Sequence, residues 1–306
     1  MNYPKVSIII LNWNGLENTF ECLDSLKKIA YHNYEVIVVD NASINDEAVL
    51  LEDKYGNYIS VIRNKKNFGF CGGNNIGIKK AIENKADYVL LLNNDTTVEP
   101  DFLDELVKVA QQDKKIGIIG AEIFDYFTKK PVFTNAKLDA KLKLERRLDY
   151  LNSSKSWWET EVISGACEMI RADCVTKYNL LLDENIFLYC DEIDICLRAK
   201  HAGYKIAVAG KSKIYHKEGM SYGGGIKPIP VYYSIRNRIY LARKMLGLKE
   251  SIVFYSLFFP ARFARILQWI ILRRFDLIDA NFCAFNDGIK GQGGKWIKKS
   301  GKIGNR

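Results

Sequence analysis

Three short, largely apolar runs, each followed at once by polar residues, organise the first third of this chain. They are Val6–Leu11, Glu35–Val39 and Tyr88–Leu92. An apolar run bounded by turn residues is typical of a strand buried in a parallel sheet. Helix-like segments separate the runs, and strands that alternate with helices indicate right-handed βαβ units. Further strands are expected at 59–62, 116–120 and 205–209.

The polar residues that end these strands are candidates for one binding site, because ligands of open α/β sheets bind beyond the carboxyl ends of the strands. A carboxylate such as Asp95 holds a hard divalent cation, and that cation neutralises a diphosphate. Asp40 is suited to accept a hydrogen bond from a nucleobase N–H or, alternatively, to cap a helix. Asn41 or Ser43 is also expected to cap the next helix. The strand-end candidates are Asn12, Asp40, Asn41, Asn93, Asn94 and Asp95.

A glycine-rich segment at 67–75 leads into a helix expected to run through Ala81. It lacks the GxGxxG spacing of a dinucleotide site. Its glycines, Gly72 among them, let the backbone approach a ligand, and its asparagines donate to phosphate or sugar oxygens. Asn67 and either Asn74 or Asn75 are therefore candidate ligand-binding residues, with a structural turn as the alternative.

An acidic group, Asp191-Glu192-Ile193-Asp194, opens a helix expected at 192–203. Crowded carboxylates beside apolar side chains raise one another's pKa, so one of them is a candidate general base. The alternative is an acidic helix start that favours the helix dipole. Asp194 and Arg198, four residues apart, are expected to form a structural ion pair.

His216 follows a strand-like segment and is one of three histidines in the chain. A lone histidine is more often structural than a ligand. With Asp95 as a first ligand, His216 is a candidate second ligand for Mn²⁺ or Mg²⁺.

Positive charge is concentrated toward the C-terminus, where residues 211–306 contain 19 Lys and Arg but 5 Asp and Glu. Anionic lipid, a phosphorylated substrate and nucleic acid are the candidate partners. Pro260 and two arginines interrupt an apolar segment at 251–272, so we do not expect it to span a membrane. It predicts an amphipathic helix with a basic face, placed on a membrane surface or docked on the core. The apolar stripe consists of Phe263, Ile266, Leu267, Ile270 and Ile271, and Arg262, Arg265 and Arg273 lie off it.

Length and cysteine content bound the class of protein. A chain of 306 residues suits one large domain, or one domain with an appendage. Seven cysteines without paired spacing favour free thiols in a reducing compartment, and a strand directly after Lys5 favours the absence of a signal peptide. The irregular residues 124–161 suggest hairpins or a mobile flap, and their place before Gly165 makes them a candidate region for acceptor specificity.

In this order, the motifs resemble the inverting nucleotide-sugar glycosyltransferases of family 2, especially the rhamnosyltransferase-like branch. The resemblance covers roughly residues 4–245. Gln292–Trp296 is also similar to the QxxRW motif of processive synthases. It has Lys for Arg and lies far from the acidic motif, so we assign it no role and expect one sugar to be added per encounter. The family-2 segments are Ser7–Asn14, Val38–Ser43, Asn67–Asn75, Leu92–Thr96, Phe187–Asp194, His216 and Tyr232–Asn237.

The resemblance implies a GT-A fold in which Asp40 contacts the nucleobase and Asn93–Asp95 replace the DxD motif. The last residue of that triplet, together with His216, would bind Mg²⁺ or Mn²⁺ on the donor diphosphate. The family pattern favours Glu192 as the base, with Asp191 as the alternative. The base would deprotonate an acceptor hydroxyl, which attacks the anomeric carbon in one displacement with inversion, while asparagine donors stabilise the departing diphosphate.

We therefore expect a GT-A catalytic domain at 1–225, with a nucleotide-binding half at 1–122 and an acceptor half at 123–225. A helical region at 226–306 would contact an anionic membrane surface. The expected donor is dTDP-rhamnose or a UDP-hexose, and the expected acceptor is a hydroxyl of a cell-surface glycan or lipid-linked oligosaccharide.

The enzyme would be cytoplasmic and peripheral on the inner face of the cell membrane, in polysaccharide and cell wall biosynthesis, with no nucleic acid partner. A homo-oligomer is compatible with the sequence. The alternatives are a pyrophosphorylase-like nucleotidyltransferase, whose Gly-rich loop with Arg and Lys is absent after the first strand, and a sugar-nucleotide-binding protein without glycosyl transfer. No nucleic-acid-binding signature supports a DNA or RNA partner.

Overall fold

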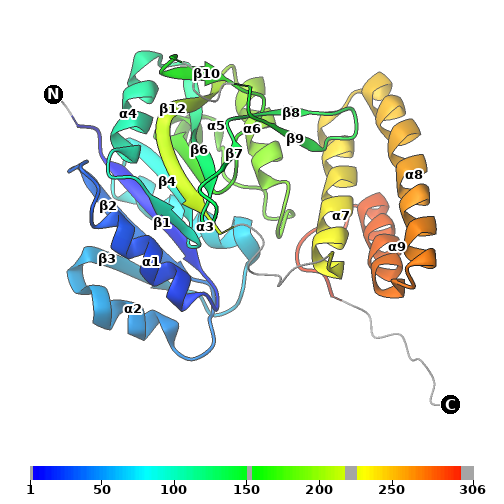
Figure 1. Ribbon diagram of the computed structural model, residues 1–306, viewed down its shortest axis with the longest axis horizontal. Coiled ribbons are helices and arrows are strands. Elements are labelled where there is room, and N and C mark those ends of the chain that lie inside the picture. Colours follow the sequence, from blue (N-terminus) through cyan, green and yellow to red (C-terminus); the bar gives the residue numbers. More distant parts are fainter. Residues whose placement is uncertain (1–2, 150–153, 218–225, 298–306) are drawn as a thin grey trace.

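A mixed, largely parallel sheet flanked by helices forms the body of the computed structural model, which describes residues 3–149, 154–217 and 226–297 (Figure 1). The strands are β1 (Val6–Asn12), β2 (Tyr34–Asp40), β3 (Ile59–Arg63), β4 (Tyr88–Asn93), β5 (Thr96–Val98), β6 (Ile116–Asp125), β7 (Pro131–Phe133), β8 (Asn135–Leu138), β9 (Leu144–Arg147), β10 (Trp157–Glu159), β11 (Cys167–Arg171) and β12 (Lys205–His216). The helices are α1 (Leu16–Leu26), α2 (Glu47–Tyr55), a 3₁₀ turn (Gly56–Tyr58), α3 (Gly69–Glu83), α4 (Phe102–Gln112), α5 (Ala172–Tyr178), α6 (Asp191–His201), α7 (Pro228–Met245), α8 (Leu248–Ile271) and α9 (Phe275–Lys290).

The strand order of the main sheet is β10-β12-β6-β11-β4-β1-β2-β3, with β5 paired to β12 and β7 paired to β6. Every strand predicted from an apolar run is present. β6 and β12 extend beyond the predicted segments, because their second halves pair with each other after a register shift. In the parallel part, Asn12 lies opposite Asp40, and Leu11 lies opposite Asn93. The polar ends of β1, β2 and β4 therefore meet at one edge of the sheet.

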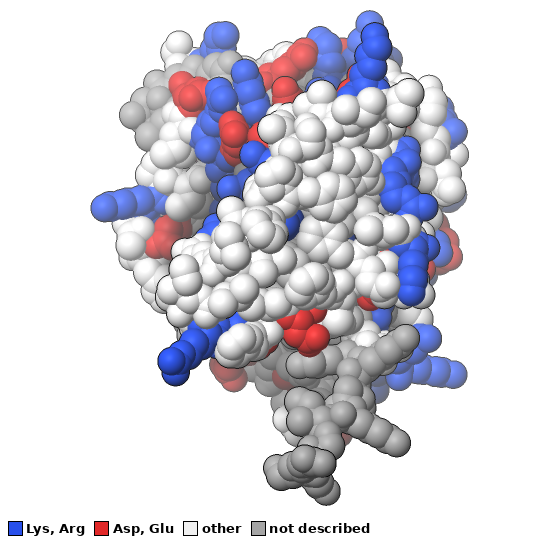
Figure 2. Space-filling model, turned by 90° about the vertical axis from the view of Figure 1, so that its right-hand side faces the viewer, with Lys and Arg blue, Asp and Glu red and all other residues white. Residues whose placement is uncertain are grey.

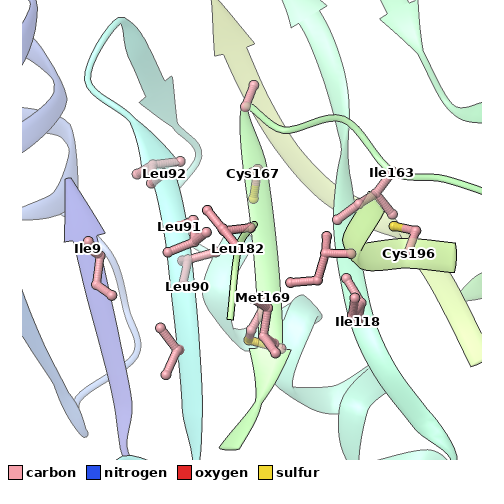
Figure 3. Close-up of a cluster of buried hydrophobic side chains, with 14 of the residues drawn as sticks. Ile9, Leu90, Leu91, Leu92, Ile118, Ile163, Cys167, Met169, Leu182 and Cys196 are labelled. Carbon is pink, nitrogen blue, oxygen red and sulfur yellow. The ribbon is translucent and has the colours of Figure 1, made fainter. Parts of the chain in front are cut away.

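The core lies around the centre of the sheet, where β11 runs antiparallel between β4 and β6 (Figure 3). Figure 3 shows apolar side chains of four adjacent strands together with Leu182, which precedes α6, and Cys196 of α6. All of the side chains labelled there are buried. This packing fixes the start of α6, and hence its acidic residues, against the middle of the sheet.

Most of the glycine-rich segment is already part of the helix, whereas the sequence predicted only that the segment leads into one. α3 already begins at Gly69. A Cβ atom added at Gly73 would lie 2.4 Å from Leu11 Cδ1, and one added at Gly77 would lie 2.6 Å from Ile9 Cγ2. The glycines therefore let α3 pack closely on β1, a role that glycine spacing alone does not distinguish from ligand contact.

The predicted cap of the second helix is wrong. α2 begins at Glu47 after Asp46, and neither Asn41 nor Ser43 caps it. Instead, the Ser43 amide donates to Asp40 Oδ2 at 3.1 Å, a local turn that delays the helix.

Hairpins occupy the irregular segment, as predicted. β8 and β9 form a separate antiparallel pair, whereas β7 and β10 join the main sheet. In Figure 1 the β8–β9 hairpin reaches from the sheet toward α7 and α8.

The helices α7, α8 and α9 pack on one another beside the sheet (Figure 1). α8 contains Pro260, and it buries Phe254, Phe258 and Trp269. Within the described ranges, no helix combines the length and the hydropathy that crossing a bilayer requires. The predicted apolar stripe faces outward, since Phe263 is 63% exposed and Ile271 is 81% exposed. Figure 2 shows this face as a broad field without charged side chains, with Lys and Arg along its margins.

Candidate active site

A first cavity of about 990 Å³ lies at the carboxyl ends of β1 and β4. Its walls come from the loop after β1, the start of α3, the segment before α6 and the C-terminal residues after α9. Six of the predicted site residues line it, namely Asn41, Asn67, Asn74, Asn93, Asn94 and Asp95. The cavity is therefore rich in neutral amides, with a single described carboxylate, that of Asp95, on its wall.

Asn12 and Asp40 do not line this cavity, and neither does Gly72. Asn12 is fully buried, and its Nδ2 donates to Asp40 Oδ1 at 3.0 Å and to Glu47 Oε2 at 2.8 Å. Its Oδ1 accepts from Thr19 Oγ1 at 2.8 Å. Asn12 thus ties two strand ends together, and the contact of Asp40 with a nucleobase stays a prediction.

Asn41 organises the entrance to α3. Its Nδ2 donates to the carbonyl oxygen of Gly69 at 3.0 Å and to Asn67 Oδ1 at 3.1 Å. Its Oδ1 accepts from the Phe68 amide at 3.1 Å. By these hydrogen bonds, the Asn41 side chain fixes residues 67–69, which lie at the edge of the first cavity.

Asp95 and His216 meet although 120 residues separate them in the sequence. The pairing of β5 with β12 sets Thr96 opposite His216, and His216 Nε2 lies 3.1 Å from Asp95 Oδ1. Among the described residues, no group of three or more His, Cys, Asp or Glu is arranged to hold a metal. A carboxylate and an imidazole at this spacing fit an ion that completes its coordination with substrate phosphates and water.

The acidic residues that open α6 have different environments. Asp191 is 5% exposed, whereas Glu192 is half-buried and lines a second cavity on the other side of the segment before α6. Burial, with the neighbouring charge of Glu192, raises the pKa of Asp191 well above its ordinary value. Burial also raises the pKa of Glu192, and Arg146 opposes that rise. Glu192 is thus the more accessible of the two carboxylates, and its pKa is raised.

The predicted ion pair on α6 is confirmed. Arg198 Nε donates to Asp194 Oδ2 at 2.7 Å, and Lys244 Nζ of α7 donates to Asp194 Oδ1 at 2.7 Å. Asp194 therefore connects two helices and is not available as a base.

The segment Phe187–Glu192 forms a wall between the two cavities. Phe187 and Leu188 line the first cavity, whereas Tyr189, Cys190 and Glu192 line the second. Tyr189 and Cys190 both adopt positive φ, 66° and 68°, which is costly for residues other than glycine.

Asn237 of α7 holds this strained wall. It is fully buried, and its Nδ2 donates to the carbonyl oxygens of Leu188 at 2.8 Å and Tyr189 at 2.7 Å. Its Oδ1 accepts from Arg236 Nε at 2.7 Å. α7 therefore anchors the segment that directly precedes Glu192.

Comparison with known proteins identifies the family of this chain. The model of glycosyl transferase family 2 matches residues 7–178, more than half of the chain. This chain belongs to glycosyl transferase family 2. An uncharacterized protein of Sinorhizobium fredii, y4gI, is 27% identical over 72% of this chain and 25% of its own length. The low-salt glycan biosynthesis hexosyltransferase Agl10 of Haloferax volcanii is 25% identical over 76% of this chain and 74% of its own.

Solved structures share the fold. The crystal structure of GalNAc-T7 with UDP, GalNAc and Mn²⁺ superposes with a TM-score of 0.65 at 16% identity, over 79% of this chain and 48% of that one. S. aureus TarS 1–349 in complex with UDP-GlcNAc superposes with a TM-score of 0.59 at 18% identity, over 94% and 81%. The predicted GT-A fold is confirmed. The chain spans only 25% of the length of y4gI, and only 37% of the length of an uncharacterized glycosyltransferase of Haemophilus influenzae to which it is 32% identical.

This family-2 chain brings two further groups to the site that the sequence did not indicate. Lys295 and Trp296 line the first cavity, and the Trp296 ring stacks on Tyr232 with centroids 4.3 Å apart. Arg236 Nη1 donates to the carbonyl oxygens of Gln292 and Gly294, which fixes this segment. The similarity of Gln292–Trp296 to QxxRW could have indicated these residues. We assigned the segment no role because it lies far from the acidic motif along the chain.

Glu168 of β11 is the second unanticipated group. It is fully buried, and neither of its carboxyl oxygens has a hydrogen-bond partner. Burial, with the charges of Asp191 and Glu192, raises its pKa well above the ordinary value. A single glutamate in a strand gives no sequence signal that its carboxyl group will be buried without a hydrogen-bond partner.

Proposed function

We propose that this chain transfers a sugar from a nucleoside diphosphate to a hydroxyl group of a glycan or lipid-linked acceptor, with inversion of the anomeric carbon. The observation that carries the proposal is the wall at Phe187–Glu192. It separates an amide-lined cavity at the strand ends from a cavity that exposes the carboxylate of Glu192. The displacement needs the attacking oxygen in contact with the anomeric carbon, so the sugar of a donor in the first cavity would extend past this segment to an acceptor hydroxyl beside Glu192.

In the proposed mechanism, Glu192 accepts the proton of the acceptor hydroxyl as that oxygen attacks the anomeric carbon. The bond between the anomeric carbon and the diphosphate oxygen breaks in the same displacement. Asp95 and His216 are the residues that would hold Mg²⁺ or Mn²⁺, which when bound supplies positive charge to the donor diphosphate. Asn93, Asn94 and Lys295 line the first cavity and would bind donor oxygens.

For the donor, we propose a UDP-hexose or dTDP-rhamnose. A UDP-hexose is supported by the UDP-GlcNAc in the TarS complex and by the hexosyltransferase name of Agl10. dTDP-rhamnose follows from the rhamnosyltransferase-like pattern of the sequence. We propose residues 1–122 for donor binding, 123–225 for the acceptor and the base, and 226–306 for membrane contact, with acceptor specificity in 124–161.

The membrane proposal rests on α8. We propose that its outward apolar stripe lies on an anionic membrane surface on the cytoplasmic side, since basic side chains border the stripe (Figure 2). Phe263→Ser with Ile271→Ser should reduce co-sedimentation with phosphatidylglycerol vesicles about tenfold. Phe127→Ser, which changes a phenylalanine that is 59% exposed elsewhere, is the control. Equal binding of both variants would contradict the proposal.

The proposed function is tested by binding and hydrolysis of UDP-, dTDP- and GDP-sugars, with and without Mn²⁺. One nucleotide class should bind in a metal-dependent way, and Asp95→Ala should weaken that binding about tenfold or more. Asp53→Ala, which removes an exposed carboxylate of α2 outside both cavities, should have no effect. Binding without any turnover to acceptor or water would favour a sugar-nucleotide-binding protein, and no binding would refute the proposal.

A further inference from the structure

The second cavity, of about 950 Å³, has six cationic side chains among the sixteen residues that line it. It lies between the turn of the β8–β9 hairpin, the start of α6, and the helices α7 and α8. Glu192 is the one carboxylate on its described wall. The cations on the wall are Lys141, Lys143, Arg146, Arg238, Arg262 and Arg265.

The positive charges of the arginines of α7 and α8 that line this cavity are not balanced by nearby carboxylates. Among the described residues, Arg238, Arg262 and Arg265 form no ion pair with a carboxylate. Arg238 and Arg262 lie over the ring of Phe258, at 4.9 Å and 6.0 Å from its centre. Burial, together with the charges of Arg238 and Arg265, lowers the pKa of Arg262 to about 10. Such crowding costs stability unless an anion occupies the cavity.

The anion is not the donor diphosphate, because the residues suited to that group line the first cavity. Asp95 and Lys295 lie there, on the other side of the wall. The cations share their cavity with Glu192, which in the proposed function contacts the acceptor. A negative charge bound here therefore belongs to the acceptor.

We propose that the second cavity binds the phosphate or diphosphate of an amphiphilic acceptor and so presents its hydroxyl group to Glu192. This inference rests on the proposed function, and it names the acceptor class. The two faces of α8 are consistent with an amphiphilic ligand. Arg262 and Arg265 line the cavity, whereas Phe263 and Leu267 are exposed to solvent. An apolar tail on the exposed face would leave the head group beside the arginines. Arginine suits this role because its fork binds phosphate oxygens in pairs.

The test measures binding of farnesyl diphosphate to the full chain by calorimetry, in EDTA so that a metal in the first cavity does not contribute. Arg262→Gln with Arg265→Gln should weaken binding about tenfold or more. Lys249→Gln, which removes an exposed charge of α8 outside the cavity, should stay within about twofold of wild type, and so should Asp95→Ala. Unchanged binding in the arginine variant, or loss in Asp95→Ala, would overturn the inference.

Two further arms separate the sources of phosphate and the two proposals. Phosphatidylglycerol vesicles that compete fully with farnesyl diphosphate, and lose binding equally in the arginine variant, would assign the cavity to membrane lipid and overturn the acceptor role. Binding of UDP with Mn²⁺ should be the same in the arginine variant and wild type, which also shows that the variant is folded. If UDP-, dTDP- and GDP-sugars all fail to bind wild type while farnesyl diphosphate binds through the arginines, the proposed donor chemistry fails and the phosphate site stands.

Discussion

The two cavities share a wall but differ in chemistry. The first presents asparagine amides, the carboxylate of Asp95 and two lysines, Lys227 and Lys295, whereas the second presents six cations and Glu192. Amides donate and accept without bringing net charge, so they suit a ligand with many hydroxyl and carbonyl groups. Guanidinium groups suit an anion.

This difference arises within one short segment, because neighbouring residues of 187–192 line different cavities. Leu188 lines the first cavity and Tyr189 lines the second, and the backbone adopts positive φ at Tyr189 and again at Cys190. The base is thereby placed on the acceptor side, away from Asp95. Two charged carboxylates in one cavity would otherwise raise each other's pKa.

The largest expected effect comes from Glu192. Glu192→Gln should lower the rate of transfer about a thousandfold while donor binding persists, because it removes the proton acceptor from one cavity only. Rates and donor titrations measure this, with Glu17→Gln as a control on the exposed side of α1. A larger loss in Asp191→Asn than in Glu192→Gln would transfer the role to Asp191.

The pH dependence sharpens the same point. A base acts when it is ionised, and burial raises the pKa of Glu192, so the rate should rise with pH above the ordinary range of a glutamate. Arg146 favours the ionised form, so Arg146→Gln should move this limb of the profile to higher pH. A shift to lower pH would contradict the assignment.

The wall itself is tested through Asn237. Asn237→Ala leaves two buried carbonyl oxygens without their donor, which should lower the free energy of unfolding by about 2 kcal/mol. The rate should also fall about tenfold or more, because Glu192 loses its position. Urea unfolding and kinetics measure both effects, with Asn286→Ala on exposed α9 as control. A loss of stability without any loss of rate would show that the wall does not position the base.

A smaller effect is expected on the first cavity alone. In Gly73→Ala the new methyl group meets Leu11 at 2.4 Å and displaces α3, which should cost about 1–3 kcal/mol of stability. Donor binding should weaken because α3 carries Asn74. Gly165→Ala, where the nearest described atoms lie at 3.9 Å, is the control for stability, measured by urea unfolding. Equal stabilities would contradict the close-packing role.

The smallest effect concerns Glu168. Its native pKa is raised by burial above the ordinary 4.5, so the native state keeps a proton that the unfolded chain releases. Wild-type stability therefore falls as the pH rises above 4.5, whereas Glu168→Gln does not lose stability through this group. We expect the variant to be the more stable protein at about pH 8 and the difference to shrink toward about pH 5. Urea midpoints at several pH values measure this, and a constant difference would contradict it.

Prediction from the sequence succeeded where local patterns reflect local structure. The strands at 6–11 and 88–92 are present because apolar runs of that length are buried in sheets. It missed that the helix already begins at Gly69, because glycine permits both a turn and a tightly packed helix. It also failed at Ser43. The Ser43 side chain was expected to cap α2, but the residue lies in a turn in which its backbone amide donates to Asp40.

The sequence by itself determined the alternation of strands and helices, the polar strand ends, the ion pair of Asp194 with Arg198, and the amphipathic α8. These depend on spacing along the chain. Only the tertiary structure decided that Asp95 lies beside His216, that Trp296 returns to the first cavity, and that Arg262 and Glu192 share the second. The reason is physical. Such contacts are set by strand order and helix packing over distances of tens to hundreds of residues, and no local propensity records them.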